Sequence, residues 1–169
     1  MIKRLSALRR GGHTRRFHTE RFIGEETVGQ HSFGVACIIT LIEDKPSAEL
    51  LMAALFHDIA EQDTGDIPAP VKWAHPDLKI LLQSIEDLFH HRHGQQLSPN
   101  LSAREHVALK WADSLDLLCT AIEQVELGNR NMCKVVMRIV AFLHNYEPHF
   151  RGLELLKKLE EYYVNSEQR

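Results

Sequence analysis

The sequence is poor in cysteine, and the three cysteines that it has form no close pair. Cys37, Cys119 and Cys133 lie far apart in a chain of 169 residues, so a CxxC redox motif or a Cys-rich zinc site is excluded. Each cysteine lies in an apolar stretch with helical spacing, which predicts buried, reduced thiols. Together these features favour a cytoplasmic protein.

Long hydrophobic runs and a strong excess of charge are also absent. No apolar run reaches the roughly 18 residues of a membrane span, and the basic N-terminus lacks the apolar core of a signal peptide. The formal net charge is only -3, which argues against general nucleic-acid binding by the whole chain. We therefore expect neither a membrane nor a nucleic acid as partner.

Several familiar functional motifs are missing as well. The sequence contains no Walker A or GxGxxG stretch, and no GxSxG or Cys-His arrangement that indicates covalent catalysis. It has no Pro-, Gly- or Ser-rich linker and no internal repeat. Residues 1–169 are therefore expected to form a single domain.

The apolar residues that are present recur with helical spacing, and no convincing alternating strand is found. Thr27 with Gln30, and Ser102 with Glu105, form capping boxes that open helices. The segment 64–73 has turn chemistry, with Gly65 as a breaker. We expect an all-α bundle of about six or seven helices. They run from Thr27 to about Ile42, Ser47 to about Ala60, Asp77 to His93, Ser102 to Gly128, Met132 to His144 and Phe150 to Val164.

Four polar residues interrupt apolar faces of these helices: His31, the pair His57 and Asp58, and Asp113. A lone histidine on such a face is usually a satisfied core residue. A buried, unpaired aspartate costs several kcal/mol, however, and two are harder to explain. A divalent cation would neutralise both aspartates and accept nitrogen from both histidines. Two imidazoles and two carboxylates suit a transition metal (Co, Zn, Mn, Fe or Ni) better than Ca²⁺.

In order and spacing these positions resemble the H…HD…D signature of the HD-domain metal-dependent phosphohydrolases. The longer string HDIAEQDTGDIPAPVKW, residues 57–73, resembles the corresponding segment of the bacterial 5'-deoxynucleotidases and of the bacteriophage dATP triphosphohydrolases. The resemblance covers about residues 15 to 120. It implies an HD-domain fold, with His31, His57, Asp58 and Asp113 as metal ligands.

The resemblance also implies roles for two acidic residues beside the metal. Glu61 lies one helical turn after Asp58, so both point to one side, and the pair is expected to orient or deprotonate the attacking water. Asp66 is expected to accept a hydrogen bond from the sugar 3'-hydroxyl. The alternatives are a surface glutamate at a helix end and an ordinary turn aspartate.

Substrate contacts are expected from an Arg-aromatic pair and two lysines. Arg16 would bind phosphate through its planar guanidinium, and Phe17 would stack on the base where the nucleotidases usually have tryptophan. Lys72 and Lys110 match positions that contact phosphate in the phage enzymes. Solvent exposure is the alternative for both lysines.

Two basic clusters have simpler interpretations. The arginines of the first 21 residues are expected to form a solvated arm, or to place one or two side chains over an anion. His90, His91 and His93 could bind a metal, but they end a helix just before Gly94, where cationic side chains suit the helix dipole.

The sequence thus predicts a cytoplasmic, homo-oligomeric hydrolase of deoxynucleotides, acting in the host cytoplasm if a phage encodes it. Three candidate phosphate-binding cations favour dATP as substrate, cleaved to deoxyadenosine and triphosphate, with Mg²⁺ accompanying the triphosphate. One alternative is a 5'-deoxyribonucleotidase that acts on monophosphates. Another is a catalytically inactive HD module that binds nucleotides as a regulator.

Overall fold

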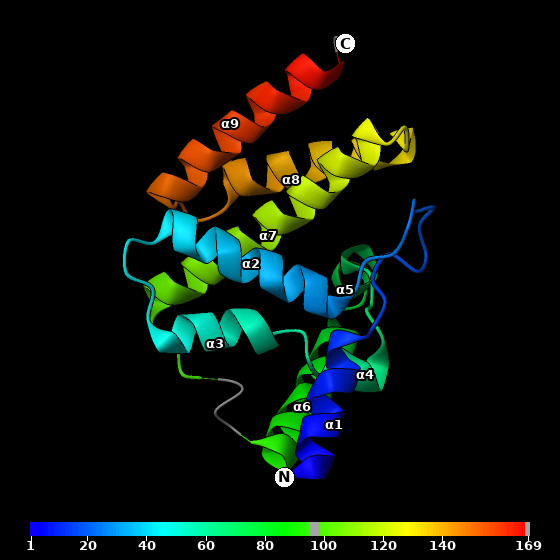
Figure 1. Ribbon diagram of the computed structural model, residues 1–169, viewed down its shortest axis with the longest axis vertical. Coiled ribbons are helices and arrows are strands. Elements are labelled where there is room, and N and C mark those ends of the chain that lie inside the picture. Colours follow the sequence, from blue (N-terminus) through cyan, green and yellow to red (C-terminus); the bar gives the residue numbers. More distant parts are fainter. Residues whose placement is uncertain (95–98, 168–169) are drawn as a thin grey trace.

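A computed structural model describes residues 1–94 and 99–167 of the chain. Its regular secondary structure is helical, and within these ranges the extended pairing is limited to one isolated bridge between Arg15 and Thr27. The all-α prediction is confirmed. The N- and C-termini lie at opposite ends of the molecule (Figure 1).

The predicted capping signals place the long helices correctly. Thr27 and Ser102 cap their helices with reciprocal hydrogen bonds to Gln30 and Glu105, and Ser47 caps a third helix. The helices are α1 (Ile2–Gly12), α2 (Val28–Ile42), α3 (Ala48–Phe56), α4 (Glu61–Thr64), α5 (Ala69–Ala74), α6 (Pro76–His93), α7 (Ala103–Glu126), α8 (Cys133–Asn145) and α9 (Phe150–Glu167), with a short 3-10 turn at Arg130–Met132.

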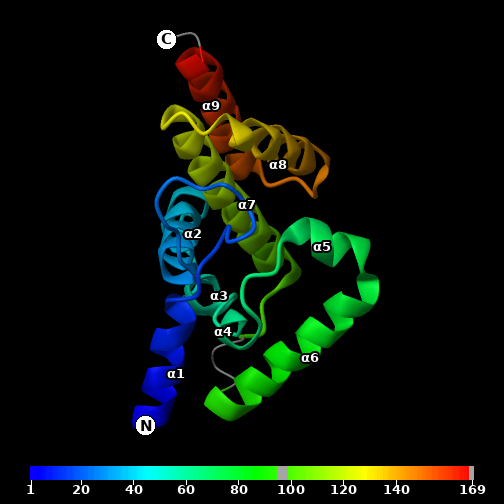
Figure 2. The same ribbon diagram turned by 90° about the vertical axis from the view of Figure 1, so that its right-hand side faces the viewer.

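The core forms around α7, which packs against α2, α3, α8 and α9. Leu115 and Leu118 of α7 are fully buried, as are Val35 and Ile39 of α2. Burial of such side chains is the main source of stability in a bundle of this kind. Figure 2 shows α1 on one side of the molecule and α5 with α6 on the other.

Three segments depart from the predicted boundaries. The helix after Ser47 ends at Phe56 rather than near Ala60, so His57 and Asp58 lie in a turn. The following segment, predicted as turns, forms the short helices α4 and α5. The N-terminal arm forms α1, because burial of Ala7 and Gly11 gives it a packed face that its many arginines obscure in the sequence.

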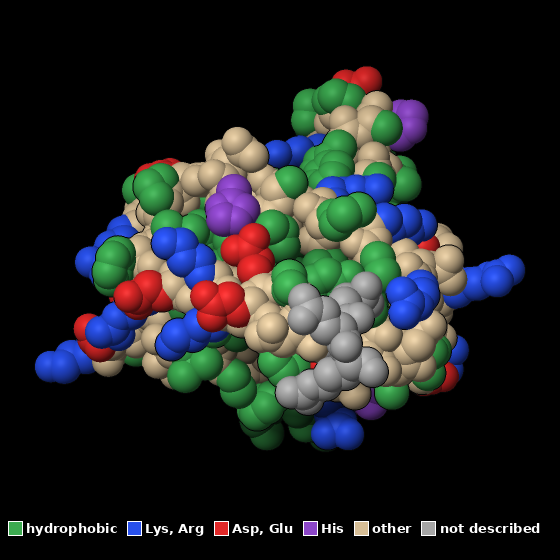
Figure 3. Space-filling model, turned by 90° about the horizontal axis from the view of Figure 1, so that it is seen from above, with side chains coloured by type: hydrophobic (Ala, Val, Ile, Leu, Met, Phe, Trp, Pro, Cys, Tyr) green, Lys and Arg blue, Asp and Glu red, His purple; other side chains and the backbone are tan. Residues whose placement is uncertain are grey.

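The prediction of three buried thiols is wrong for Cys37, which is exposed, while Cys119 and Cys133 are partly buried. Cys37 lies on the outer side of α2, opposite the face that packs on α7. Of the helices in residues 1–94 and 99–167, none is long and apolar enough to cross a membrane. On the face shown in Figure 3, basic and acidic side chains are interspersed with hydrophobic ones.

Candidate metal centre and active site

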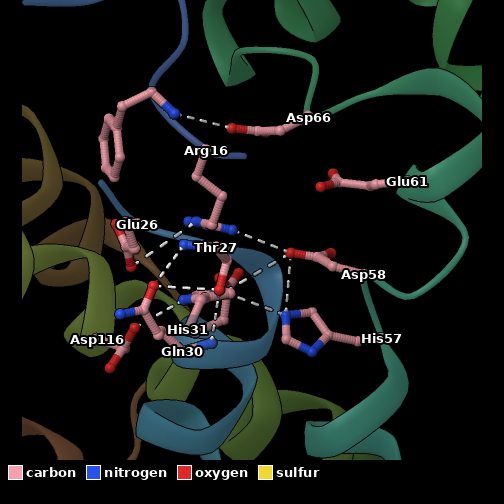
Figure 4. A network of polar contacts seen from close by, with 12 residues as sticks. Arg16, Glu26, Thr27, Gln30, His31, His57, Asp58, Glu61, Asp66 and Asp116 are labelled. Atoms are coloured by element: carbon pink, nitrogen blue, oxygen red, sulfur yellow. Dashed lines mark hydrogen bonds and ion pairs between the residues drawn. The ribbon is translucent and has the colours of Figure 1, made fainter. Parts of the chain in front are cut away.

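Three separate elements bring the four predicted metal ligands together. His31 projects from α2, His57 and Asp58 follow the end of α3, and Asp113 projects from α7. Figure 4 shows the two imidazoles facing each other, with Asp58 above them. The packing of α2 and α3 against α7 therefore creates the site.

The donor atoms of this cluster lie close to one another. The Nε2 atoms of His31 and His57 are 3.3 Å apart, and Asp113 Oδ1 lies 3.3 Å from His31 Nε2. Donor atoms of these three residues all lie within 4.8 Å of one another. Asp58 Oδ2 is 3.4 Å from His57 Nε2 and 3.7 Å from His31 Nε2. A single ion could contact all four residues after small adjustments.

The second nitrogen of each imidazole indicates which tautomer is present. His57 Nδ1 lies 2.9 Å from the carbonyl oxygen of Ala54, and His31 Nδ1 lies 2.7 Å from Asp116 Oδ2. Carbonyl and carboxylate oxygens only accept, so both Nδ1 atoms carry hydrogen. Nε2 is therefore the nitrogen that each ring turns toward the other imidazole and the aspartates. A cluster of two imidazoles and carboxylates of this kind fits a cation.

The protonation of the cluster supports the same conclusion. Burial lowers the pKa of His31, but its hydrogen bonds to Asp113 and Asp116 outweigh burial and raise that pKa to about 9. Burial likewise opposes ionisation of Asp113, yet Lys110 and His31 hold its pKa well below the usual range. The carboxylates thus favour positive charge at this point, whether a proton on His31 or a bound cation, and two imidazoles with carboxylates suit a transition-metal ion.

Glu61 lies beside this cluster at the start of α4. A cavity of about 90 Å³ is lined by His57, Asp58, Glu61, Lys72 and residues of α6. Burial and the negative charges of Asp58 and Asp66 raise the pKa of Glu61 to about 8. Its Oε2 is buried without a hydrogen-bond partner in the described part of the chain, and its Oε1 lies 3.5 Å from Lys72 Nζ. A carboxyl group whose pKa lies this close to neutrality can exchange a proton with water.

The predicted substrate residues of the N-terminal segment also reach the site. The guanidinium of Arg16 is buried and donates to Asp58 Oδ2 at 3.1 Å. The backbone N–H of Phe17 donates to Asp66 Oδ2 at 3.3 Å. The Phe17 ring stacks on Phe22, with ring centres 4.9 Å apart. Arg16 and Asp66 thus hold the segment before α2 against the turns that follow α3.

Both predicted lysines form ion pairs with acidic residues of the site. Lys110 Nζ lies 2.7 Å from Asp113 Oδ2, one turn along α7, and Lys72 contacts Glu61. The side chain of Lys110 is 45% exposed, and that of Lys72 is 35% exposed. Each lysine therefore lies against an acidic side chain of the site while part of its surface remains open to solvent.

The sequence analysis missed three acidic residues around the site: Asp116, Glu26 and Glu86. Asp116 binds His31, Glu26 lies 3.9 Å from Arg16, and Glu86 lines the cavity with Glu61. For Asp116 a signal existed, because it follows Asp113 by three residues on α7 and must share its face. Glu26 and Glu86 lie on other elements, so their distance in sequence from the predicted ligands did not indicate that they reach the site.

Comparison with known proteins decides the family. The model of the family described as 5'-deoxynucleotidase YfbR-like matches residues 1–151. The chain belongs to this family. The match extends well past the region, residues 15 to 120, in which the sequence motifs carried the resemblance.

Curated relatives in this family are distant. A 5'-deoxynucleotidase of Photorhabdus laumondii is 25% identical over 103 residues, which span 53% of this chain and 52% of the relative. Another, from Photobacterium profundum, is 26% identical over 131 residues, covering 64% of this chain and 68% of that protein. The match thus spans about half the length of the first of these relatives.

Solved structures share the fold over nearly the whole chain. An HD-domain phosphohydrolase of Listeria innocua has a TM-score of 0.77 at 20% identity, covering 97% of this chain and 89% of that one. The HD phosphohydrolase DatZ of cyanophage S-2L, solved with dA and one catalytic Zn²⁺ ion, has a TM-score of 0.69 at 17% identity, covering 95% and 96%. The predicted HD-domain bundle is confirmed.

Proposed function

We propose that the protein is a metal-dependent phosphohydrolase that cleaves the 5'-phosphate ester of deoxynucleotides. The observation that carries this proposal is the convergence of two imidazole Nε2 atoms and two aspartates beside a cavity that Glu61 lines. Membership of the 5'-deoxynucleotidase family supports the substrate class. A regulator without activity would have no need for a buried carboxylate at that position.

In this proposal His31, His57, Asp58 and Asp113 hold a divalent ion of Co, Zn, Mn, Fe or Ni. When bound, such an ion polarises the phosphoryl group and makes water more acidic. Glu61, with Asp58, positions the attacking water and accepts its proton. Arg16 and the two lysines stabilise the negative charge that grows on the phosphoryl oxygens.

The nucleoside would lie on the other side of the phosphate. Asp66 retains acceptor capacity for a sugar hydroxyl beyond its bond to Phe17, because a carboxylate oxygen has more than one lone pair. Phe17 would form an apolar wall for the base. It offers no hydrogen-bond donor, so fine discrimination among bases is not expected from it.

Monophosphates are the better supported substrates. The sequence favoured dATP because it offered three candidate phosphate-binding cations. In the structure each is paired with a carboxylate of the site: Arg16 with Asp58, Lys72 with Glu61 and Lys110 with Asp113. Among the described residues of the site, these three cations therefore already have acidic partners and are less available to a β- or γ-phosphate. We accordingly place 5'-deoxyribonucleotidase activity first.

A dATP triphosphohydrolase is the second candidate, favoured by the partial exposure of Lys72 and Lys110 and by the shared fold with DatZ, which was solved with dA.

The deciding experiment incubates the protein with each dNMP and dNTP, with Mn²⁺, Co²⁺ or Zn²⁺ and with or without Mg²⁺. Products are identified by mass. Deoxynucleoside and phosphate from monophosphates support the first candidate. Deoxyadenosine with intact triphosphate from dATP supports the second, and no release from any nucleotide overturns both.

We also propose that the chain forms a homo-oligomer through α6, with a second copy as the partner. Among its residues only Phe89 and His90 are buried, and Ile80, Leu81 and Leu88 are more than half exposed. Asp77 and Arg92 stand at the two ends of the same face. An antiparallel pair of α6 helices would bury the apolar residues and join opposite charges.

Light scattering tests this assembly. Leu81→Lys should convert the oligomer to monomers, while Met137→Lys, at an exposed apolar position of α8, should not. A monomeric wild type, or an unchanged mass in Leu81→Lys, contradicts the assignment of this face.

A further inference from the structure

The imidazole of His31 is held at both of its nitrogens by carboxylates of one helix. Its Nδ1 lies 2.7 Å from Asp116 Oδ2, and its Nε2 lies 3.3 Å from Asp113 Oδ1. The two aspartates are three residues apart on α7 and therefore lie one turn apart on the same face. The side chain of His31 is 0% exposed, so neither nitrogen is in contact with bulk solvent.

We propose that Asp116 is a positioning residue of the metal centre, acting through His31, and that Gly34 provides the space it needs. The inference rests on the metal-dependent function proposed above. Because the carboxylate only accepts, it keeps the hydrogen on Nδ1 and leaves the Nε2 lone pair for the ion. It also fixes the plane of the ring and raises the basicity of the donor nitrogen.

Gly34 lies three residues after His31 on α2, at the point where α2 packs on α7. A Cβ added there would lie 1.8 Å from Asp116 Oδ1 and 2.7 Å from its Cγ. The nearest atoms are all in the Asp116 carboxylate, the mobile end of a side chain rather than backbone. Alanine at position 34 would therefore displace the carboxylate while the helices stay packed.

Other buried groups around Asp116 limit where that carboxylate can go. Glu26 is 8% exposed, and its Oε1 accepts a hydrogen bond from Thr120 Oγ1 at 3.3 Å. Oxygen atoms of Glu26 and Asp116 lie within 4.8 Å of each other and of a His31 nitrogen. A displaced Asp116 would be repelled by this second acidic group if it moved toward Glu26.

The test compares binding of Mn²⁺ and Zn²⁺ by calorimetry in wild type, Asp116→Asn, Asp116→Ala and Gly34→Ala. We expect Asp116→Ala and Gly34→Ala to bind about 10- to 100-fold more weakly than wild type. Asp116→Asn should fall between, because its amide oxygen can still accept from Nδ1. Glu123→Gln, at an exposed acidic position of α7, is the matched control and should bind like wild type.

A second readout separates positioning from general loss of structure. In the zinc-loaded protein, ¹⁵N NMR of the imidazoles should show His31 protonated at Nδ1 in wild type, and a changed signal in Asp116→Ala. Circular dichroism checks that each variant is folded, and Gly34→Ala decides the matter if Asp116→Ala does not fold. Wild-type affinity in the folded variants overturns the role of Asp116. A wild type that binds neither metal instead overturns the proposed function.

Discussion

At the scale of single residues, the candidate site depends on ligands that approach one point from unconnected helices. His57 and Asp113 come from different elements, and each contributes a donor atom to the same small cluster. His57→Ala or Asp113→Ala should therefore abolish tight metal binding and phosphohydrolase activity. Metal content per chain, measured by mass spectrometry after gel filtration, checks this. His91→Ala, at an exposed histidine of α6, is the control, and a full metal complement in either ligand variant would show that the site is misplaced.

Glu61 is assigned to the water rather than to the ion, and this division can be tested separately. Its pKa is raised to about 8 by burial, and then by Asp58 and Asp66, which is typical of a group prepared to exchange a proton. Glu61→Gln should reduce turnover by about 10²- to 10⁴-fold, with metal content unchanged. Asp63→Asn, at an exposed position of α4, should have little effect. Normal turnover in Glu61→Gln, or loss of its metal, contradicts the assignment.

At the scale of elements, the starts of α3 and α7 are joined by one carboxylate. The hydroxyl of Ser47 donates to Glu105, which also accepts from the hydroxyl of Ser102 at 2.7 Å and from its backbone N–H at 2.9 Å. These bonds, that of Ser47 first, lower the pKa of Glu105 to about 2. These hydrogen bonds hold the starts of α3 and α7 together, and both helices position residues of the site.

This junction predicts a specific pH dependence of stability. A lowered pKa in the folded state means that the ionised Glu105 stabilises the fold above its unfolded pKa, about 4.3, and that this stabilisation is lost as pH falls toward 2. Glu105→Gln resembles the protonated wild type. Its melting temperature should be below that of wild type at pH 7, and the gap should narrow between pH 5 and 3. Thermal melts at pH 7, 5 and 3 check this, and a gap independent of pH contradicts it.

At the scale of the whole molecule, the proposed metal would connect α2, the turn after α3, and α7. An ion that binds only the folded state stabilises it by about 2.7 kcal/mol at 100 times its Kd. For a chain of this size that corresponds to about 5 to 10 °C in Tm. Chelation should lower the Tm by this amount, and added Mn²⁺ or Zn²⁺ should restore it.

The control for that experiment is Asp113→Ala, whose Tm should not respond to added metal. If the Tm of the wild type is the same with and without metal, the ion does not stabilise the packing of these helices. Differential scanning fluorimetry on chelated protein is sufficient for both measurements.

Much of this architecture was determined by local sequence. The capping boxes at Thr27 and Ser102 fixed the starts of α2 and α7, because a side chain that binds an unpaired backbone N–H acts within one turn. The spacing of the HD motif and its following turn identified the residues that we propose carry the chemistry. Residues such as Asp66 and Arg16 were identified because the family motif places them, and the structure brings them to the same site.

Tertiary structure decided what local sequence could not, since charge pairing and burial depend on which elements meet. From the sequence, Lys72 and Lys110 were candidate phosphate contacts or solvent-exposed side chains, and the fold places them beside Glu61 and Asp113. Asp116 contacts His31 only because α2 packs against α7. Packing decides these pairings. In two of them the partners lie on different helices, and in the Lys110–Asp113 pair the conformation of the side chains on α7 decides the contact. The sequence by itself thus determined the fold class and the HD motif whose residues we propose as metal ligands, and the packing of α2 and α3 on α7 decided how the charges around that motif pair.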